Sequence, residues 1–174
     1  MTKIDYISDT VKKLVKKHGT RDPFRLCDAL EIRIRYKKLG RVNGFFFYQS
    51  RIRNIVLNED LSDISARILC AHELGHACLH KDMLVTMRAI SGTVSHSGTI
   101  SEYEANIFAA ELLIPDEDIS DLLKSRGKSL FELAGELYVP PELIDFKLRV
   151  MQSRGLCTDA PYLEDADFLR GDIE

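Results

Sequence analysis

Apolar residues follow a helical spacing near both ends of the chain and a strand spacing between residues 32 and 58. Near the start, Ile4, Ile7 and Val11 recur every three or four positions, which predicts an amphipathic helix. The stretch DPFRLCDAL, with a proline in its first turn, predicts a short second helix. Helices are therefore expected on both sides of a β-rich segment.

The β-rich segment divides into three runs. IRIRYKK alternates apolar and polar residues, as a strand with one solvent-exposed face does. NGFFFYQS and RIRNIVLN are both rich in strand-forming residues and meet near Ser50, which predicts a β-hairpin. Together with the helices, this pattern predicts an α+β fold in which helices pack against a small antiparallel β-sheet.

Helical spacing returns from Ser62, a residue suited to capping a helix. Later in the chain, residues 128–155 have the spacing of a helix-turn-helix, with Ala134 in the first helix facing apolar residues of the second. The start of the second helix carries Glu142 and Asp145, which DNA phosphates would repel. Packing beside the rest of the domain is therefore favoured, and direct nucleic-acid binding is not expected.

The composition narrows the class of protein. The chain of 174 residues is 45% hydrophobic and 29% charged with a formal net charge of −3, which is typical of one soluble globular domain. No apolar run approaches the ~20 residues of a membrane span, so no membrane partner is expected. The four cysteines lack C-x-x-C spacing and the start of the chain lacks a signal-peptide core, which favours reduced thiols and a cytoplasmic location.

The candidate chemistry lies in CAHELGHACLH, residues 70–80, which holds three of the five histidines. Residues four apart on a helix share one face, so His72 and His76 can bind the same cation. Glu73 is rotated by about 100° from His72 and can take a proton from a water that zinc activates, without binding the metal itself. Gly75 argues against an ordinary buried helix, because a helical glycine costs about 1 kcal/mol and indicates close approach to another element.

A third ligand is expected from the helix around residues 101–113, and two glutamates are candidates. Glu102 shares its helical face with small residues that allow close approach to Gly75, and with Asn106, which could orient a ligand through a hydrogen bond. Glu104 lies toward bulkier side chains, on a face expected to be more exposed. Glu102 is therefore favoured, and Glu104 remains the alternative.

His80 follows His76 by four residues, as His76 follows His72. Eight residues of helix rise about 12 Å, so His72 and His80 are too far apart to share one zinc ion. A supporting or structural role beside the site is expected for His80. A metzincin site would need a histidine at position 82, and Asp82 excludes that class.

Two motifs in this order, AHELGHACLH and then EYEANIFAAELLIP, resemble the ImmA/IrrE family of metallopeptidases. The resemblance covers about residues 50–150 and includes the passage from a strand into the HELGH helix. By position in the motifs it implies His72 and His76 as metal ligands, Glu73 as catalytic base and Glu102 as third ligand.

The resemblance also implies a function. The implied function is zinc-dependent endopeptidase activity of the gluzincin type. The enzyme would act inside the cell on a protein substrate, such as a helix-turn-helix repressor of a mobile element. Residues 1–156 are expected to form a single metallopeptidase domain, followed by an acidic, partly disordered tail over residues 157–174. The alternative is a regulatory module that binds a repressor or DNA with little or no proteolysis.

Two further features of a peptide-cleaving site are expected. Residues 51–57 of the hairpin could pair with an extended substrate strand beside the zinc ion. His96 or Tyr103 could help to stabilise the oxyanion that forms during peptide hydrolysis.

Overall fold

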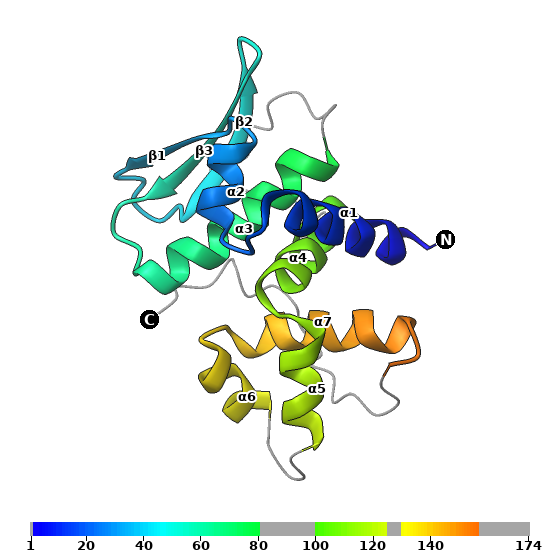
Figure 1. Ribbon diagram of the computed structural model, residues 1–174. Coiled ribbons are helices and arrows are strands. Elements are labelled where there is room, and N and C mark those ends of the chain that lie inside the picture. Colours follow the sequence, from blue (N-terminus) through cyan, green and yellow to red (C-terminus); the bar gives the residue numbers. More distant parts are fainter. Residues whose placement is uncertain (1, 81–99, 125–129, 157–174) are drawn as a thin grey trace.

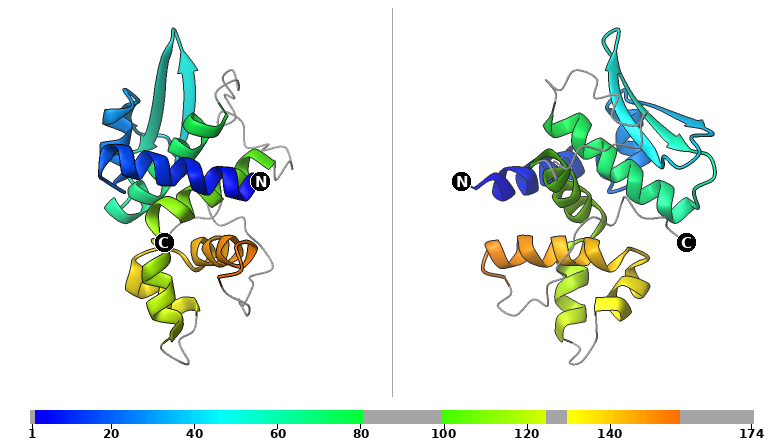
Figure 2. Two further views of the ribbon diagram at one scale, coloured as in Figure 1. Left: turned by 45° about the vertical axis from the view of Figure 1, so that its right-hand side comes forward. Right: turned by 180° about the vertical axis from the view of Figure 1, so that it is seen from behind.

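The structure, a computed structural model, describes residues 2–80, 100–124 and 130–156, and it has the predicted α+β fold (Figure 1). Figure 2 shows the sheet at one end of the molecule and α5, α6 and α7 at the other, with α3 and α4 between them. The acidic tail expected over residues 157–174 lies outside the described residues, as does His96. The bounds of the elements are α1 (Lys3–His18), α2 (Pro23–Ala29), β1 (Arg33–Lys37), β2 (Gly44–Gln49), β3 (Ile52–Asn58), α3 (Asp63–Leu79), α4 (Ile100–Leu113), α5 (Asp116–Lys124), α6 (Leu130–Leu137) and α7 (Pro141–Ser153).

The sheet has three strands in the order β1-β3-β2. β2 and β3 form the predicted hairpin, which turns at Ser50 and Arg51 with positive φ angles of 52° and 64°. β1 pairs with β3 in parallel, with Ile34 opposite Ile55, so the sheet is mixed rather than wholly antiparallel. The chain reverses after β1 and again after β2, so β3 runs in the direction of β1 and lies between the other two strands. This central position gives β3, which is buried over residues 54–58, hydrogen-bonding partners on both sides.

The order of the strands decides which of them can accept a further strand. β3 is paired on both sides, so the expectation that residues 51–57 pair with a substrate is wrong. Within the described part of the chain, β2 forms one edge of the sheet, and it also contacts α3. Any strand that adds to this sheet on the side of β2 therefore pairs with residues 44–49.

α3 is the central helix of the protein. Ser62 caps its N-terminus as predicted, and its hydroxyl accepts a hydrogen bond of 3.2 Å from the backbone N–H of Ser65. Nearly every residue of α3 from Ser65 to Ala77 is buried, because the sheet, α2 and α4 surround the helix. Side chains on such a helix are held more precisely than side chains on a loop, which suits a site that must keep its geometry.

α4 crosses α3 at short distance, where α3 carries a glycine. A Cβ atom added to Gly75 would lie 3.1 Å from the Cα of Ala105 and 3.1 Å from the Cβ of Phe108. This confirms the expectation that Gly75 permits close approach to the later helix. The crossing brings the N-terminal half of α4 beside HELGH, so residues distant in the sequence meet there.

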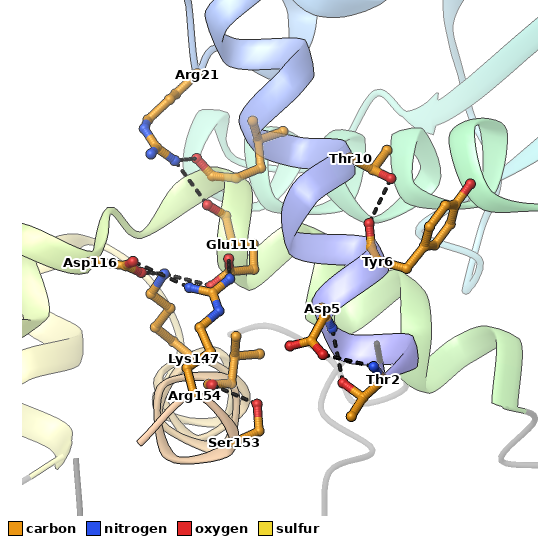
Figure 3. Close-up of polar contacts among 12 residues, drawn as sticks. Thr2, Asp5, Tyr6, Thr10, Arg21, Glu111, Asp116, Lys147, Ser153 and Arg154 are labelled. Atoms are coloured by element: carbon orange, nitrogen blue, oxygen red, sulfur yellow. Dashed lines mark hydrogen bonds and ion pairs between the residues drawn. The ribbon is translucent and has the colours of Figure 1, made fainter. Parts of the chain in front are cut away.

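Charged side chains join α5 and α7 to α4, as Figure 3 shows. The ammonium of Lys147 lies 2.6 Å from Glu111 and also contacts Asp116. The guanidinium of Arg154 binds the same two carboxylates, at 2.6 and 3.2 Å. Because two cations face two anions, no charge in this cluster is buried alone, which would be far more costly. The predicted C-terminal helical pair is present, with Ala134 buried against α7.

The close crossing at Gly75 predicts an unusual response to alanine. In an open helix, Gly→Ala stabilises by up to about 1 kcal/mol, and we expect this gain for Gly135→Ala in α6, where nothing lies within 4 Å of the added Cβ. Gly75→Ala should instead lower the free energy of unfolding by about 1 to 2 kcal/mol, because overpacking against the backbone of Ala105 outweighs the helix propensity. Urea denaturation of both variants measures the difference. A Gly75→Ala variant at least as stable as the parent would contradict the tight crossing.

Candidate metal centre

Three side chains predicted as metal ligands meet where α3 and α4 cross. The Nε2 atoms of His72 and His76, one turn apart on α3, are separated by 3.2 Å. Glu102, in the first turn of α4, places Oε2 3.3 Å from Nε2 of His72 and Oε1 3.5 Å from Nε2 of His76. One ligand atom from each residue therefore lies within 4.8 Å of the others.

These separations fit a tetrahedral metal ion. Ligand atoms about 2.1 Å from a zinc ion at tetrahedral angles lie about 3.4 Å from one another. The separation of 3.2 Å between the two Nε2 atoms is close to this value, and each Nε2 lies at a similar distance, 3.3 or 3.5 Å, from one of the two oxygens of Glu102. Two imidazoles and one carboxylate are also a common donor set for catalytic zinc, which keeps its fourth position open. The cluster could thus hold a divalent transition metal with one position free.

Asn106 orients one of the two imidazoles. Its Oδ1 lies 2.8 Å from Nδ1 of His72, and both side chains are buried. An amide oxygen only accepts hydrogen bonds, so Nδ1 of His72 donates and the neutral ring keeps an unprotonated Nε2. That lone pair faces the cluster with His76 and Glu102. Asn106 was expected to orient a ligand through a hydrogen bond, and its partner in the structure is His72.

The neighbours of Glu102 in the cluster change the pKa of its carboxyl group. The imidazoles of His72 and His76 hold the pKa of the Glu102 carboxyl well below its usual range, more strongly than partial burial raises it. The group is therefore ionised at neutral pH and supplies a negative oxygen to the cluster.

Glu73 lies beside the cluster but is not one of its three members. Burial raises the pKa of Glu73 to about 7, and the negative charge of Glu102 acts in the same direction. The nearby imidazole of His76 and a hydrogen bond from the backbone N–H of Phe46 oppose this rise. A carboxyl group that titrates near neutral pH can both accept and return a proton under ordinary conditions.

β2 supplies the contact to Glu73, because Phe46 lies in this edge strand. The strand comes close to α3 at Gly44, where an added Cβ would lie 2.8 Å from Cδ2 of Leu69. This main-chain contact gives no side-chain pattern in the sequence and was not predicted.

Glu104 does not lie on an exposed face, contrary to the expectation. It is buried, because α1 packs across that side of α4. Its Oε2 lies 3.1 Å from Nε2 of His80, and the ammonium of Lys3 lies 2.9 Å from its Oε1. His80 in turn contacts His76, and burial lowers the pKa of the His80 imidazole. Of the two candidate glutamates, Glu102 faces the histidine pair and Glu104 faces His80.

Tyr103, considered as a helper for the oxyanion, is directed toward another part of the molecule. Its ring packs edge-to-face on Phe146 of α7, with 5.6 Å between ring centroids. This contact places the Tyr103 ring between α4 and α7. The described residues therefore provide no geometric support for an oxyanion role of Tyr103.

Comparison with known proteins identifies the family of the chain that carries this cluster. The peptidase M78 family, described as the IrrE N-terminal-like domain, matches residues 27–149, a span that includes both histidines of HELGH and Glu102. The chain belongs to this peptidase family. The ImmA/IrrE resemblance of the two motifs is thereby confirmed. None of the described helices of this family member is long and apolar enough to cross a membrane.

Two relatives of this peptidase-family chain come from bacilli and their phages. An uncharacterized immunity region protein 2 of Bacillus phage phi105 is 34% identical over 146 residues, which make up 81% of this chain and 88% of the relative. Metallopeptidase ImmA of Bacillus subtilis strain 168 is 31% identical over 145 residues, which make up 82% of this chain and 83% of the relative. Both alignments extend well beyond the two motifs.

The raised pKa of Glu73 predicts how the stability of the metal-free protein depends on pH. The folded pKa of about 7 lies above the ordinary value of 4.5, so between these values the folded chain holds a proton that the unfolded chain has lost. The free energy of unfolding should therefore fall as pH rises from 4.5 to 7, by on the order of 3 kcal/mol. Glu73→Gln should remove this fall.

The measurement is urea unfolding at pH 5 and pH 8 in the presence of a chelator. Glu73→Gln should match the parent at pH 5 and be more stable at pH 8. Glu117→Gln, at an exposed position of α5, is the control and should keep the parental dependence. A parental and a Glu73→Gln curve that run parallel between the two pH values would show that the buried carboxyl is not the cause.

Proposed function

We propose that this chain is a zinc-dependent endopeptidase in which His72, His76 and Glu102 hold the metal and Glu73 is the general base. The observation that carries the proposal is that two imidazoles and one carboxylate converge at the crossing of α3 and α4, with one ligand atom of each within 4.8 Å of the others. Membership of a peptidase family and the name of the ImmA relative support the same chemistry. Zinc is the natural choice for two imidazoles and one carboxylate.

A zinc ion bound there would polarise the scissile carbonyl and lower the pKa of water to about 7. The protein contributes orientation: Asn106 keeps Nε2 of His72 unprotonated and aimed at the cluster. Burial of His72 and Glu73 excludes bulk water from one side of the site, which strengthens the electrostatic interactions there.

Glu73 moves the protons in this proposal. Its carboxylate takes a proton from the attacking water and returns it to the leaving amine. The hydrogen bond from Phe46 N–H holds the carboxylate in place while these transfers occur. The same residue therefore acts first as general base and then as general acid.

The edge strand β2 is the proposed docking site for the substrate. In an antiparallel pair, hydrogen-bonding groups alternate between the partner strand and the other side. The carbonyl of Asn43 accepts a bond of 2.8 Å from the N–H of Asn58 in the continuation of the β2–β3 ladder. By the same alternation, Gly44, Phe46 and Tyr48 direct their main-chain groups away from β3.

An extended substrate segment would pair along this edge. Because Phe46 N–H already binds Glu73, the edge is tied to the catalytic carboxylate, and a peptide paired with β2 would pass beside the metal cluster. An endopeptidase of this design needs a substrate with a segment that can be extended, since a folded helix cannot add to a strand.

The proposed substrate is a helix-turn-helix transcriptional repressor of a mobile element. The immunity-region name of the phage relative supports a role in the control of such an element, and the ImmA relative is named a metallopeptidase. Such a repressor acts in the cytoplasm, where we propose that this peptidase also works. Proteolysis would then relieve repression.

Glu73→Gln tests this proposal, because the amide keeps the volume of the side chain but cannot take a proton. We expect the variant to bind zinc and the repressor of the same mobile element while cleaving the repressor about 10² to 10⁴ times more slowly. Intact-mass spectrometry follows cleavage, and size-exclusion chromatography follows the complex. Glu117→Gln, which changes an exposed charge by the same amount, should cleave at the parental rate.

The competing function is that of a regulatory module that acts by binding. If Glu73→Gln relieves repression as well as the parent does, and neither protein cleaves the repressor, the peptidase proposal is wrong and binding is the function.

A further inference from the structure

A row of polar side chains leads from His76 away from the metal cluster to the other side of α4. Nδ1 of His76 lies 3.1 Å from Nδ1 of His80. Nε2 of His80 lies 3.1 Å from Oε2 of Glu104, and the ammonium of Lys3 lies 2.9 Å from Oε1 of the same carboxylate. The side chains of His80 and Glu104 are only 11% and 5% exposed, whereas that of Lys3 is 67% exposed.

The chemistry of each group decides which atom donates and which accepts in each of these hydrogen bonds. An ionised carboxylate only accepts hydrogen bonds, so Nε2 of His80 must donate to Glu104. A neutral imidazole carries one N–H, which leaves Nδ1 of His80 as an acceptor. Nδ1 of His76 must then donate to His80, and Nε2 of His76 keeps its lone pair. That atom is the one that faces His72 and Glu102.

The opposite direction would disable the site. If His80 donated through Nδ1, the Nδ1 atom of His76 would have to accept, and its proton would move to Nε2. A protonated Nε2 has no lone pair for a metal ion. The buried acceptor Glu104 excludes this arrangement, because it has no proton to donate to Nε2 of His80.

We propose that His80 and Glu104 are positioning residues that hold His76 in the tautomer with the proton on Nδ1, and so keep Nε2 ready for the metal. Asn106 does the same for His72 directly. Both acceptors belong to α4, so this helix orients both histidines of α3 and also supplies Glu102. The inference rests on the proposed function, because it takes Nε2 of His76 to be a metal ligand.

Three variants of the full-length chain separate orientation from packing. His80→Leu keeps the approximate size of the side chain but removes the nitrogen that accepts the hydrogen bond from His76. His80→Asn keeps an acceptor, because its Oδ1 is attached to Cγ as Nδ1 is in histidine. Lys3→Ala removes only the exposed ammonium at the end of the row, and an exposed ion pair contributes little.

The dissociation constant for zinc, measured by competition with a chromophoric chelator, is the readout. Removing a group that orients a metal ligand typically weakens metal binding by 10-fold to 100-fold. We expect His80→Leu to weaken zinc binding by about 10-fold and His80→Asn and Lys3→Ala to stay within about threefold of the parent. This pattern supports the proposal.

Other outcomes overturn it in distinguishable ways. If the parent binds zinc and His80→Leu binds it equally well, the orienting role is wrong while the metal site stands. If His80→Leu and His80→Asn are weakened equally, packing and not the acceptor matters. If the parent itself binds no zinc, the proposed function fails and this inference fails with it.

A second measurement on the parental protein needs no variant to fold. Long-range ¹H–¹⁵N correlation spectra of the zinc-loaded, ¹⁵N-histidine-labelled chain report which ring nitrogen carries each proton. The expected result is a proton on Nδ1 of His76 and on Nε2 of His80. A proton on Nδ1 of His80 would overturn the proposal.

Discussion

The site depends on how closely α4 approaches α3. The backbone of Ala105 lies against Gly75, and no side chain separates the two helices at that point. This contact sets the position of α4 relative to HELGH and brings Glu102 beside both histidines and Asn106 beside His72. A residue larger than glycine at position 75 would move α4 outward, and the three ligand separations would grow with it.

The crossing also gives most of the polar side chains buried here a polar partner. His72 binds Asn106, His76 faces His80, and His80 binds Glu104, so these imidazoles have partners on the side away from the cluster. Glu73 is different, because burial opposes its charge and only a backbone N–H and a nearby imidazole favour it. Its raised pKa costs stability and suits proton transfer, and a strained environment of this kind is typical of a catalytic group.

Much of the site could be predicted because its signals are local. The four-residue spacing of His72 and His76 and the small-residue face around Glu102 follow from helical geometry alone, and the structure brings these three residues together. The wrong expectations all concern contacts between distant segments. The mixed sheet and the central place of β3 follow from strand order, and the burial of Glu104 follows from the packing of α1 on α4. The spacing of residues around Glu104 cannot predict its contact with Lys3, because α1 and α4 are far apart in the sequence.

The central claim is that zinc binds His72, His76 and Glu102, and X-ray absorption at the zinc edge tests it most directly. For the zinc-loaded chain, the account predicts about one zinc ion bonded only to nitrogen and oxygen at about 2.0 to 2.1 Å, with the outer-shell signal of two imidazoles. His76→Ala should lose that bound zinc. A sulfur neighbour near 2.3 Å, or a parental chain that retains no zinc after dialysis, would contradict the account.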